Sequence, residues 1–209
     1  MSIPRRRFLG TLAVPLFGAQ SDPWQRMADV LKRIQPPKFP NRDFPITKFG
    51  AAPDGRSDST LEMQKAIAAC ATAGDGRVVV PAGVFLTGPI HLKSNVNLHL
   101  AQGSVVKFTQ DPAKYLPLVF SRWEGMECMN YSPFVYADRQ KNIAITGEGT
   151  LDGQSDCAHW WPWKGRTECG WLKKDVPVER RVFGEGSYLR PQFIQPCRCG
   201  NSIPSAAAT

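Results

Sequence analysis

The chain has 209 residues, of which 42% are hydrophobic and 21% charged, and its formal net charge at pH 7 is +8. This composition excludes a disordered or collagen-like chain, and no apolar run approaches the roughly 20 residues that a membrane-spanning helix needs. The positive charge suits an anionic partner. Because lysines and arginines are not interleaved with aromatic residues in a dense run, we expect no nucleic-acid partner.

Residues 1–21 have the pattern of an export signal. The basic segment Arg5–Arg7 precedes Phe8 and Leu9, a short apolar stretch over 11–17 and two small residues. This order is typical of a bacterial twin-arginine signal, and a plain secretory signal is the alternative. Either signal predicts an exported protein, periplasmic or extracellular, with no membrane partner once the signal is removed.

Six cysteines are then expected in a compartment that permits disulfides. Cys157 and Cys169 flank a tryptophan-rich loop and are candidates for a pair, whereas most of the six are predicted to be small buried hydrophobes. The spacing of Cys197 and Cys199 is too short for a Cys-x-x-Cys pair. With three histidines and no His-Glu-x-x-His motif, we expect no metal site and no cofactor.

Residues 22–43 are predicted to form a leading helix and a linker. Asp22 can cap the helix, Pro23 suits its first position, and the prolines at 36 and 37 end it. Apolar residues recur at helical spacing on one face, namely Trp24, Met27, Val30, Leu31 and Ile34.

A strand is predicted over Phe44–Phe49, and a second amphipathic helix from Thr60 to about Ala73. Ser59-Thr60-Leu61-Glu62 has the pattern of a capping box, in which the serine accepts from a helical amide and the glutamate reaches back. Gly74 is placed to end the helix. A helix at this position would close the amino-terminal end of a solenoid.

The segment Val78–Phe108 alternates apolar and polar residues with a period of two, which predicts half-buried strands. Its phrase Asn95–Val105 is echoed by Asn142–Leu151. Recurrence of a strand–turn–strand unit indicates stacked coils and therefore a parallel β-helix, with a β-sandwich as the alternative. Further strands are predicted over Phe134–Ala137, Asn142–Gly153 and Tyr188–Cys197.

Two loops carry the candidate substrate contacts. Ser121–Ser132 is polar, aromatic and glycine-containing and is predicted to be a loop, in which Arg122 and Glu124 would touch substrate or pair with each other. Residues 159–171 hold four tryptophans. Because aromatic rings either stack on sugars or fill a loop's own core, Trp160 is the third candidate contact.

The last residues open another coil without completing it. Cys199-Gly200-Asn201 resembles the start of a third asparagine-led coil, but Ser202–Thr209 lack alternating apolar residues, and Pro204 cannot donate in a strand ladder. We therefore expect residues 44–209 to be the first coils of a β-helix that is truncated at its carboxyl end.

The segments FPITKFGAAPDG, RVVVPAGVFLTGPIHLKSNVNLHL, RWEGMECMNYSPFVYA, NIAITGEGTLDG and LRPQFIQP together resemble the amino-terminal part of glycoside hydrolase family 28, the polygalacturonases and related pectin hydrolases. The resemblance implies an all-β, right-handed parallel β-helix and a monomeric intact enzyme. It also implies inverting hydrolysis of the α-1,4 bonds between galacturonic acid units of pectin or oligogalacturonides. The Arg-Trp-Glu-Gly and Leu-Arg-Pro phrases are most similar to the bacterial exo-acting branch.

The catalytic motifs of that family are absent from the 209 residues. The family uses aspartates in an Asn-Thr-Asp motif and an Asp-Asp pair, so that one carboxyl protonates the leaving oxygen while carboxylate activates a water, with about 6.5–9.5 Å between them. Neither motif occurs, nor do the His-Gly and Arg-Ile-Lys that follow them. We therefore assign no catalytic residue, and interpret Asp138, Glu148 and Asp152 as turn and surface acids.

The sequence thus predicts the amino-terminal fragment of a pectin-degrading hydrolase that is inactive by itself. A non-catalytic β-helix module that binds acidic glycan through the tryptophan-rich loop is the alternative. An adhesin-like β-helix without sugar chemistry is a third, which the Arg-Trp-Glu-Gly and Leu-Arg-Pro phrases disfavour.

Overall fold

The computed structural model of the chain describes residues 22–34, 36–163 and 176–204. It divides into two units, with the boundary after residue 35. The first unit contains α1 (Pro23–Arg33), in which the Asp22 carboxylate accepts a hydrogen bond from the backbone N–H of Trp24 at 3.1 Å. The predicted leading helix and its aspartate cap are confirmed. No helix within the described ranges is long and apolar enough to cross a membrane.

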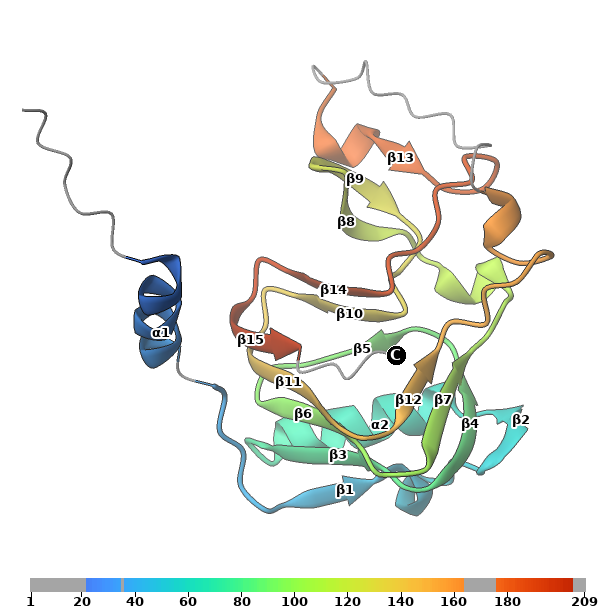
Figure 1. The fold of residues 1–209 in the computed structure, drawn as a ribbon. Coiled ribbons are helices and arrows are strands. Elements are labelled where there is room, and N and C mark those ends of the chain that lie inside the picture. Colours follow the sequence, from blue (N-terminus) through green and yellow to red (C-terminus); the bar gives the residue numbers. More distant parts are fainter. Residues whose placement is uncertain (1–21, 35, 164–175, 205–209) are drawn as a thin grey trace, which may run out of the picture. The chain divides into compact units, whose positions relative to one another are not determined.

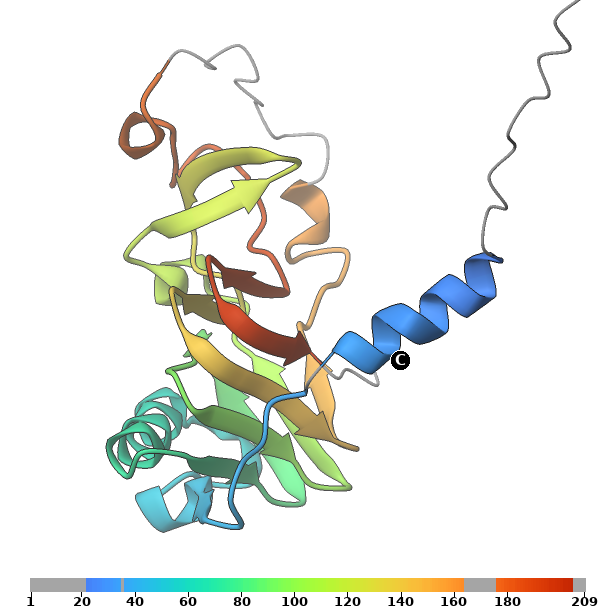
Figure 2. The same cartoon turned by 90° about the vertical axis from the view of Figure 1, so that its left-hand side faces the viewer.

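The second unit is a right-handed parallel β-helix built from three sheets, as predicted (Figure 1). Sheet A contains β1 (Asp43–Pro45), β3 (Gly76–Val80), β6 (Val96–Leu100), β11 (Lys141–Gly147) and β15 (Gly200–Pro204). Sheet B contains β2 (Asp54–Asp58), β4 (Gly83–Thr87), β7 (Ser104–Phe108) and β12 (Thr150–Asp152). Sheet C contains β5 (Ile90–His91), β10 (Val135–Asp138) and β14 (Ile194–Cys197). The first coil has β1 and β2 only, the next three pass from sheet A through sheet B to sheet C, and Figure 2 shows the coils stacked along one axis.

The repeat found in the sequence corresponds to neighbouring coils. Leu98 of β6 lies opposite Ile145 of β11 in parallel register, and Val78 of β3 lies opposite Leu98 on the other side. Asn95 directly precedes β6 and Asn142 is the second residue of β11, and their φ values of 65° and 53° are a left-handed conformation that asparagine tolerates. The side-chain amide of Asn142 donates to the Asn95 side-chain oxygen at 3.2 Å, which links one turn to the next.

The core runs through the middle of the stack. Like side chains lie above one another in successive coils, so apolar surface is buried between coils rather than within one. The rings of Phe108 and Phe134 stack with their centroids 5.0 Å apart. Phe85 of β4 lies opposite Val106 of β7, and both are fully buried.

Helix α2 (Thr60–Thr72) closes the end of the stack where the first coil lies. Four of its side chains are buried in the same core as the strands, namely Met63, Ala66, Ile67 and Cys70. The predicted capping helix is therefore confirmed.

The predicted capping box does not form. Ser59 occupies the N-cap position, but its hydroxyl donates to the Ser57 carbonyl at 3.4 Å and makes no bond to a helical amide. Asp58 instead accepts the backbone N–H of Thr60 at 3.0 Å, because its carboxylate reaches the helix start from outside while Ser59 is 1% exposed.

The first predicted strand is shorter than expected. Only β1 (Asp43–Pro45) pairs with β3, and Ile46–Phe49 forms a 3-10 helix, η1. Gly50 ends η1 with φ of 103°, and its N–H donates to the Thr47 carbonyl. Ile46 is buried in the core, and the chain turns through the rest of η1 into the loop that begins at Gly50.

Two long connections leave the β-helix between sheets B and C, one over 109–134 and one over 153–193. The first contains η2 (Pro112–Tyr115) and the hairpin β8 (Val119–Trp123) and β9 (Met126–Asn130). The second contains η3 (Trp161–Trp163), η4 (Val178–Arg180) and β13 (Val182–Phe183), which pairs with β9. Figure 1 shows β8, β9 and β13 gathered beyond sheet C.

The remaining predicted strands are present with revised limits. β10, β11 and β12 fall within the predicted segments 134–137 and 142–153 or within a residue of them, whereas only Ile194–Cys197 of the predicted 188–197 is a strand. The start of a further coil is confirmed, because β15 pairs with β11 as far as Pro204, which lies opposite Ile145. Residues 205–209 lie outside the described residues.

Candidate functional site

The segment predicted as a loop around Arg122 and Glu124 is an antiparallel hairpin, so that prediction was wrong. Strands β8 and β9 are joined by Glu124 and Gly125, with φ of 45° and 89°. Positive φ at both central residues is the geometry of the tight turn that best fits the twist of a two-stranded ribbon. Arg122 and Glu124 therefore lie at the end of a hairpin with a defined backbone conformation.

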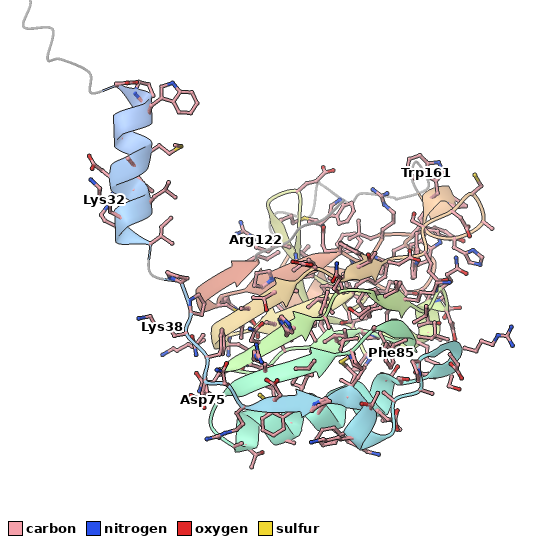
Figure 3. The ribbon with its side chains drawn as sticks, turned by 60° about the horizontal axis from the view of Figure 1, so that its bottom comes forward. Lys32, Lys38, Asp75, Phe85, Arg122 and Trp161 are labelled. Atoms are coloured by element: carbon pink, nitrogen blue, oxygen red, sulfur yellow. The ribbon has the colours of Figure 1, made fainter. Side chains whose placement is uncertain are left out.

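Arg122 and Glu124 are both exposed on this hairpin. Arg122 donates to the carbonyl of Gly125 at 3.5 Å, and no ion pair joins it to Glu124 among the described residues. The internal salt bridge considered from the sequence is therefore not formed, and the guanidinium faces solvent at the hairpin tip. Figure 3 shows Arg122 well apart from Trp161.

The hairpin is anchored to a row of side chains that crosses sheet C. Tyr136 of β10 lies in register with His91 of β5 and Gln195 of β14. The Tyr136 hydroxyl donates to the Phe120 carbonyl at 2.6 Å. Gln195 accepts from the Ser121 hydroxyl at 2.8 Å and donates to the Arg122 carbonyl at 2.8 Å. These bonds fix β8 over the outer face of sheet C.

Arg198, in the turn between β14 and β15, adds a second anchor. Its guanidinium forms a bidentate pair with the Asp138 carboxylate at 2.7 and 2.5 Å and lies 3.9 Å from the centroid of the Phe120 ring. The flat face of the guanidinium stacks on the Phe120 ring, while the N–H groups at its edge pair with the Asp138 carboxylate. The turn of one coil thereby holds the hairpin that leaves from another.

We predict that Arg198→Ala loosens the hairpin without unfolding the β-helix. Loss of this ion pair and of the cation–π contact should let the hairpin open more often, so amide hydrogen exchange in β8 and β9 should accelerate about fivefold. Arg139→Ala is the matched control, because Arg139 occupies the same turn one coil earlier with φ of 55° against 52°, and its side chain is exposed. Equal acceleration in both variants would show that the turn backbone, not the Arg198 side chain, restrains the hairpin.

His91 belongs to the same row and lies beside Ser132, but the two do not form a nucleophilic pair. Nε2 of His91 is 2.8 Å from the Ser132 hydroxyl, and the His91 ring meets Tyr136 edge-on with centroids 5.3 Å apart. Although His91 as a whole residue is exposed, the partial burial of its ring among these neighbours lowers its pKa. Ser132 is 2% exposed, and a substrate cannot reach its hydroxyl.

Trp160 lies in the core. Its side chain is 4% exposed and contacts the rings of Tyr115, Phe134 and Trp163 at centroid distances of 5.3, 5.7 and 5.2 Å. The neighbouring Trp161 is 55% exposed. Of the two uses of aromatic residues considered from the sequence, the geometry of Trp160 matches the loop's own core. A direct substrate contact by Trp160 stays a prediction, and Trp171 lies outside the described residues.

The buried cysteines are unreactive thiols. Cys70, Cys128 and Cys197 are each no more than 5% exposed, and desolvation by burial raises the pKa of each to about 11. The prediction of small buried hydrophobes is confirmed for these three of the six, whereas Cys199 is half-buried. Cys157 is exposed, and its proposed partner Cys169 lies outside the described residues.

Two of the acids named from the sequence, Asp138 and Asp152, are the last residues of β10 and β12, and Glu148 lies in a turn. Asp138 pairs with Arg198, and Asp152 accepts the backbone N–H of Gln154 at 2.8 Å. Glu148 is exposed in the turn after Gly147. Within residues 22–34, 36–163 and 176–204, no group of three histidine, cysteine, aspartate or glutamate side chains is placed to hold a metal ion.

The anchors of the hairpin were missed by sequence reasoning. Gln195 and Arg198 lie more than 70 residues beyond the hairpin strand they hold. One signal was available for Arg198, because the turns 138–142 and 197–201 both have arginine in second place and asparagine in fifth.

Comparison with known proteins decides the family. Residues 44–167, more than half of the chain, match the family described as rhamnogalacturonase A/epimerase, pectate lyase-like. The chain belongs to this pectate lyase-like family. All elements from β2 to β12, α2 included, lie within the matched residues, and the match begins at the second residue of β1.

Relatives of this pectate lyase-like chain include polygalacturonases. An exopolygalacturonase from Thermotoga maritima is 45% identical and superposes with a TM-score of 0.79, covering 87% of this chain and 44% of its own. An exo-poly-α-D-galacturonosidase of Dickeya chrysanthemi is 37% identical over 116 residues, which are 52% of this chain and 19% of that protein. An exopolygalacturonase of Zea mays is 32% identical over 120 residues, 55% of this chain and 26% of that protein. The chain therefore matches less than half the length of each relative, in the amino-terminal part of glycoside hydrolase family 28, as the sequence resemblance implied.

Proposed function

We propose that this chain forms the amino-terminal coils of an exo-acting polygalacturonase-type hydrolase that cleaves α-1,4-galacturonosyl bonds with inversion. The observation that carries the proposal is the 45% identity to the Thermotoga maritima exopolygalacturonase over 87% of this chain. Because these 209 residues lack the aspartate motifs of the family, they supply substrate-holding surface, while the acid and the base of the reaction come from other coils.

The substrate surface that we propose is the hairpin tip above sheet C. Galacturonate units carry one carboxylate each, and a planar guanidinium pairs with a carboxylate through two parallel hydrogen bonds. Arg122 presents such a guanidinium to solvent, and the exposed Glu124 offers acceptors for sugar hydroxyls. Trp160 packs in the core at the start of the connection 153–193. Contact between Trp160 and sugar is kept as part of this proposal.

We predict that oligogalacturonate binding depends on Arg122. Arg122→Ala should weaken the binding of trigalacturonate about tenfold, the factor that one charge-assisted contact supplies, as measured by isothermal titration calorimetry. The matched control is Arg56→Ala, since Arg56 is also an exposed arginine on a strand but belongs to sheet B at the other end of the stack. Equal losses in both variants would mean that net charge rather than the hairpin attracts the ligand.

The second candidate function is a non-catalytic module for acidic glycan, which would also bind oligogalacturonate without hydrolysing it. The absence of both aspartate motifs from the 209 residues favours that candidate. The two candidates are distinguished by adding further coils to the chain, because hydrolysis is then expected for the hydrolase and not for the binding module.

We also propose export through a twin-arginine signal over residues 1–21, followed by a leading segment over 22–43 and the coils from residue 44. The signal lies outside the described residues, and the proposal rests on Arg5–Arg7 and the apolar stretch after them. For the intact enzyme we propose a monomer.

A further inference from the structure

Helix α1 is amphipathic along its whole length. At 100° per residue, its apolar side chains cover one side of the helix, with exposed fractions that run from 41% for Val30 to 72% for Trp24. The set comprises Trp24, Met27, Val30 and Leu31, and Ile34 continues it just past the last helical residue. Such a face requires an apolar partner.

The rest of the helix is basic. Arg26, Lys32 and Arg33 stand against Asp29 within the helix and Asp22 at its N-cap, so residues 22–34 keep a net charge of +1, and Figure 3 shows Lys32 on α1. Lys32 and Asp29 are 3.3 Å apart, but their side chains are 77% and 71% exposed, so solvent screens the pair and leaves the helix with a positive field. Charge complementarity therefore calls for an anionic partner that also takes up apolar side chains.

Size decides between a second copy of the helix and a lipid surface. Eleven helical residues span about 16 Å, and one face of so short a helix offers far less than the roughly 800 Å² per partner that a stable dimer buries. A lipid surface needs no shape-matched partner, because affinity there grows with apolar area and with attraction between cations and anionic headgroups. Trp24 at one end suits the boundary between headgroups and water.

We propose that α1 is an interfacial helix that binds the surface of an anionic lipid bilayer with its apolar face in the headgroup region. The sequence predicted no membrane partner once the export signal is removed, and the lack of a spanning apolar run excludes a helix that crosses a bilayer but not one that lies on it. The β-helix would then be held near the membrane through the linker that begins at Pro36. This inference is independent of the proposed hydrolase function.

The test is co-sedimentation of the full 209-residue chain with phosphatidylcholine vesicles, with and without phosphatidylglycerol. We expect stronger partition onto the anionic vesicles, and weaker partition as salt is added. Leu31→Gln should lower the partition coefficient about tenfold, the factor for removing one buried leucine. Glutamine forms helix about as well as leucine, so α1 itself is retained.

Matched controls lie in the β-helix unit. Leu61→Gln alters a leucine of α2 that is 63% exposed, against 57% for Leu31, and should leave partition unchanged. Lys32→Gln should reduce binding to anionic vesicles only, whereas Lys48→Gln, at an exposed lysine of η1, should not.

Three outcomes would overturn the proposal. They are no partition, equal partition of the Leu31→Gln and Leu61→Gln variants, and self-association without vesicles that Leu31→Gln abolishes. The last would identify a second copy of the chain as the occupant. Residues 1–21 are present in every variant, so their own contribution cannot produce a difference between the variants.

Discussion

Gly147→Ala is expected to destabilise the β-helix by about 4 kcal/mol or more, at the extreme of single substitutions. Gly147 ends β11 with φ of 104°, and a Cβ there would lie 2.0 Å from the carbonyl oxygen of Leu100 in the preceding coil. That oxygen already accepts the N–H groups of Glu148 and Gly149 at 2.9 and 3.2 Å, so it cannot withdraw without breaking the turn. The substitution forces two coils apart.

The matched control is Gly74→Ala. Gly74 has nearly the same φ, 101°, but a Cβ there would meet nothing within 4 Å. Only the cost of a left-handed alanine remains, about 1–2 kcal/mol. Urea titration of both variants gives the difference directly, and equal losses would refute the close approach between coils as the reason for glycine at 147.

Trp160→Ala is the substitution with the second-largest expected effect, a loss of about 3–5 kcal/mol. The indole fills space between Tyr115, Phe134 and Trp163, and removing it leaves a cavity in the core where two connections leave the β-helix. Trp161→Ala removes the same side chain one residue later, at a position 55% exposed, and should cost less than about 1 kcal/mol.

A third variant separates packing from hydrogen bonding at this position. The indole nitrogen of Trp160 is buried without a hydrogen-bond partner within the described residues, so Trp160→Phe gives up no bond and should cost less than half as much as the alanine variant. A Trp160→Ala protein that keeps its urea midpoint but loses oligogalacturonate binding would instead show that Trp160 acts on sugar.

The coils were predictable because paired strands carry similar sequence patterns. Asn95 and Asn142 mark equivalent turns, and the period of two after each fixes which side chains enter the core, so the register of Leu98 on Ile145 follows. The capping helix was likewise visible from its apolar face. Its cap was assigned to Ser59 rather than Asp58, because both residue types cap helices and the sequence does not say which side chain is buried.

The candidate site was predictable only in part. Arg122 and Glu124 were found because they lie in a polar segment, but a Glu-Gly pair is a weaker turn signal than Asn-Gly or Asp-Gly, and the hairpin was missed. The partners Gln195 and Arg198 belong to a later coil. Which connection folds back onto which sheet depends on the stacked coils as a whole, and no local pattern encodes it.

We have proposed that this chain provides the first coils of a polygalacturonase-type hydrolase and lacks its catalytic carboxylates. The most direct measurement is the release of galacturonic acid from polygalacturonate by two proteins, the 209-residue chain and a fusion of residues 1–200 to the remaining coils of the Thermotoga maritima exopolygalacturonase. We predict no release by the chain alone and release by the fusion. Hydrolysis by the chain alone, or a folded fusion that binds polygalacturonate without cleaving it, would contradict the claim.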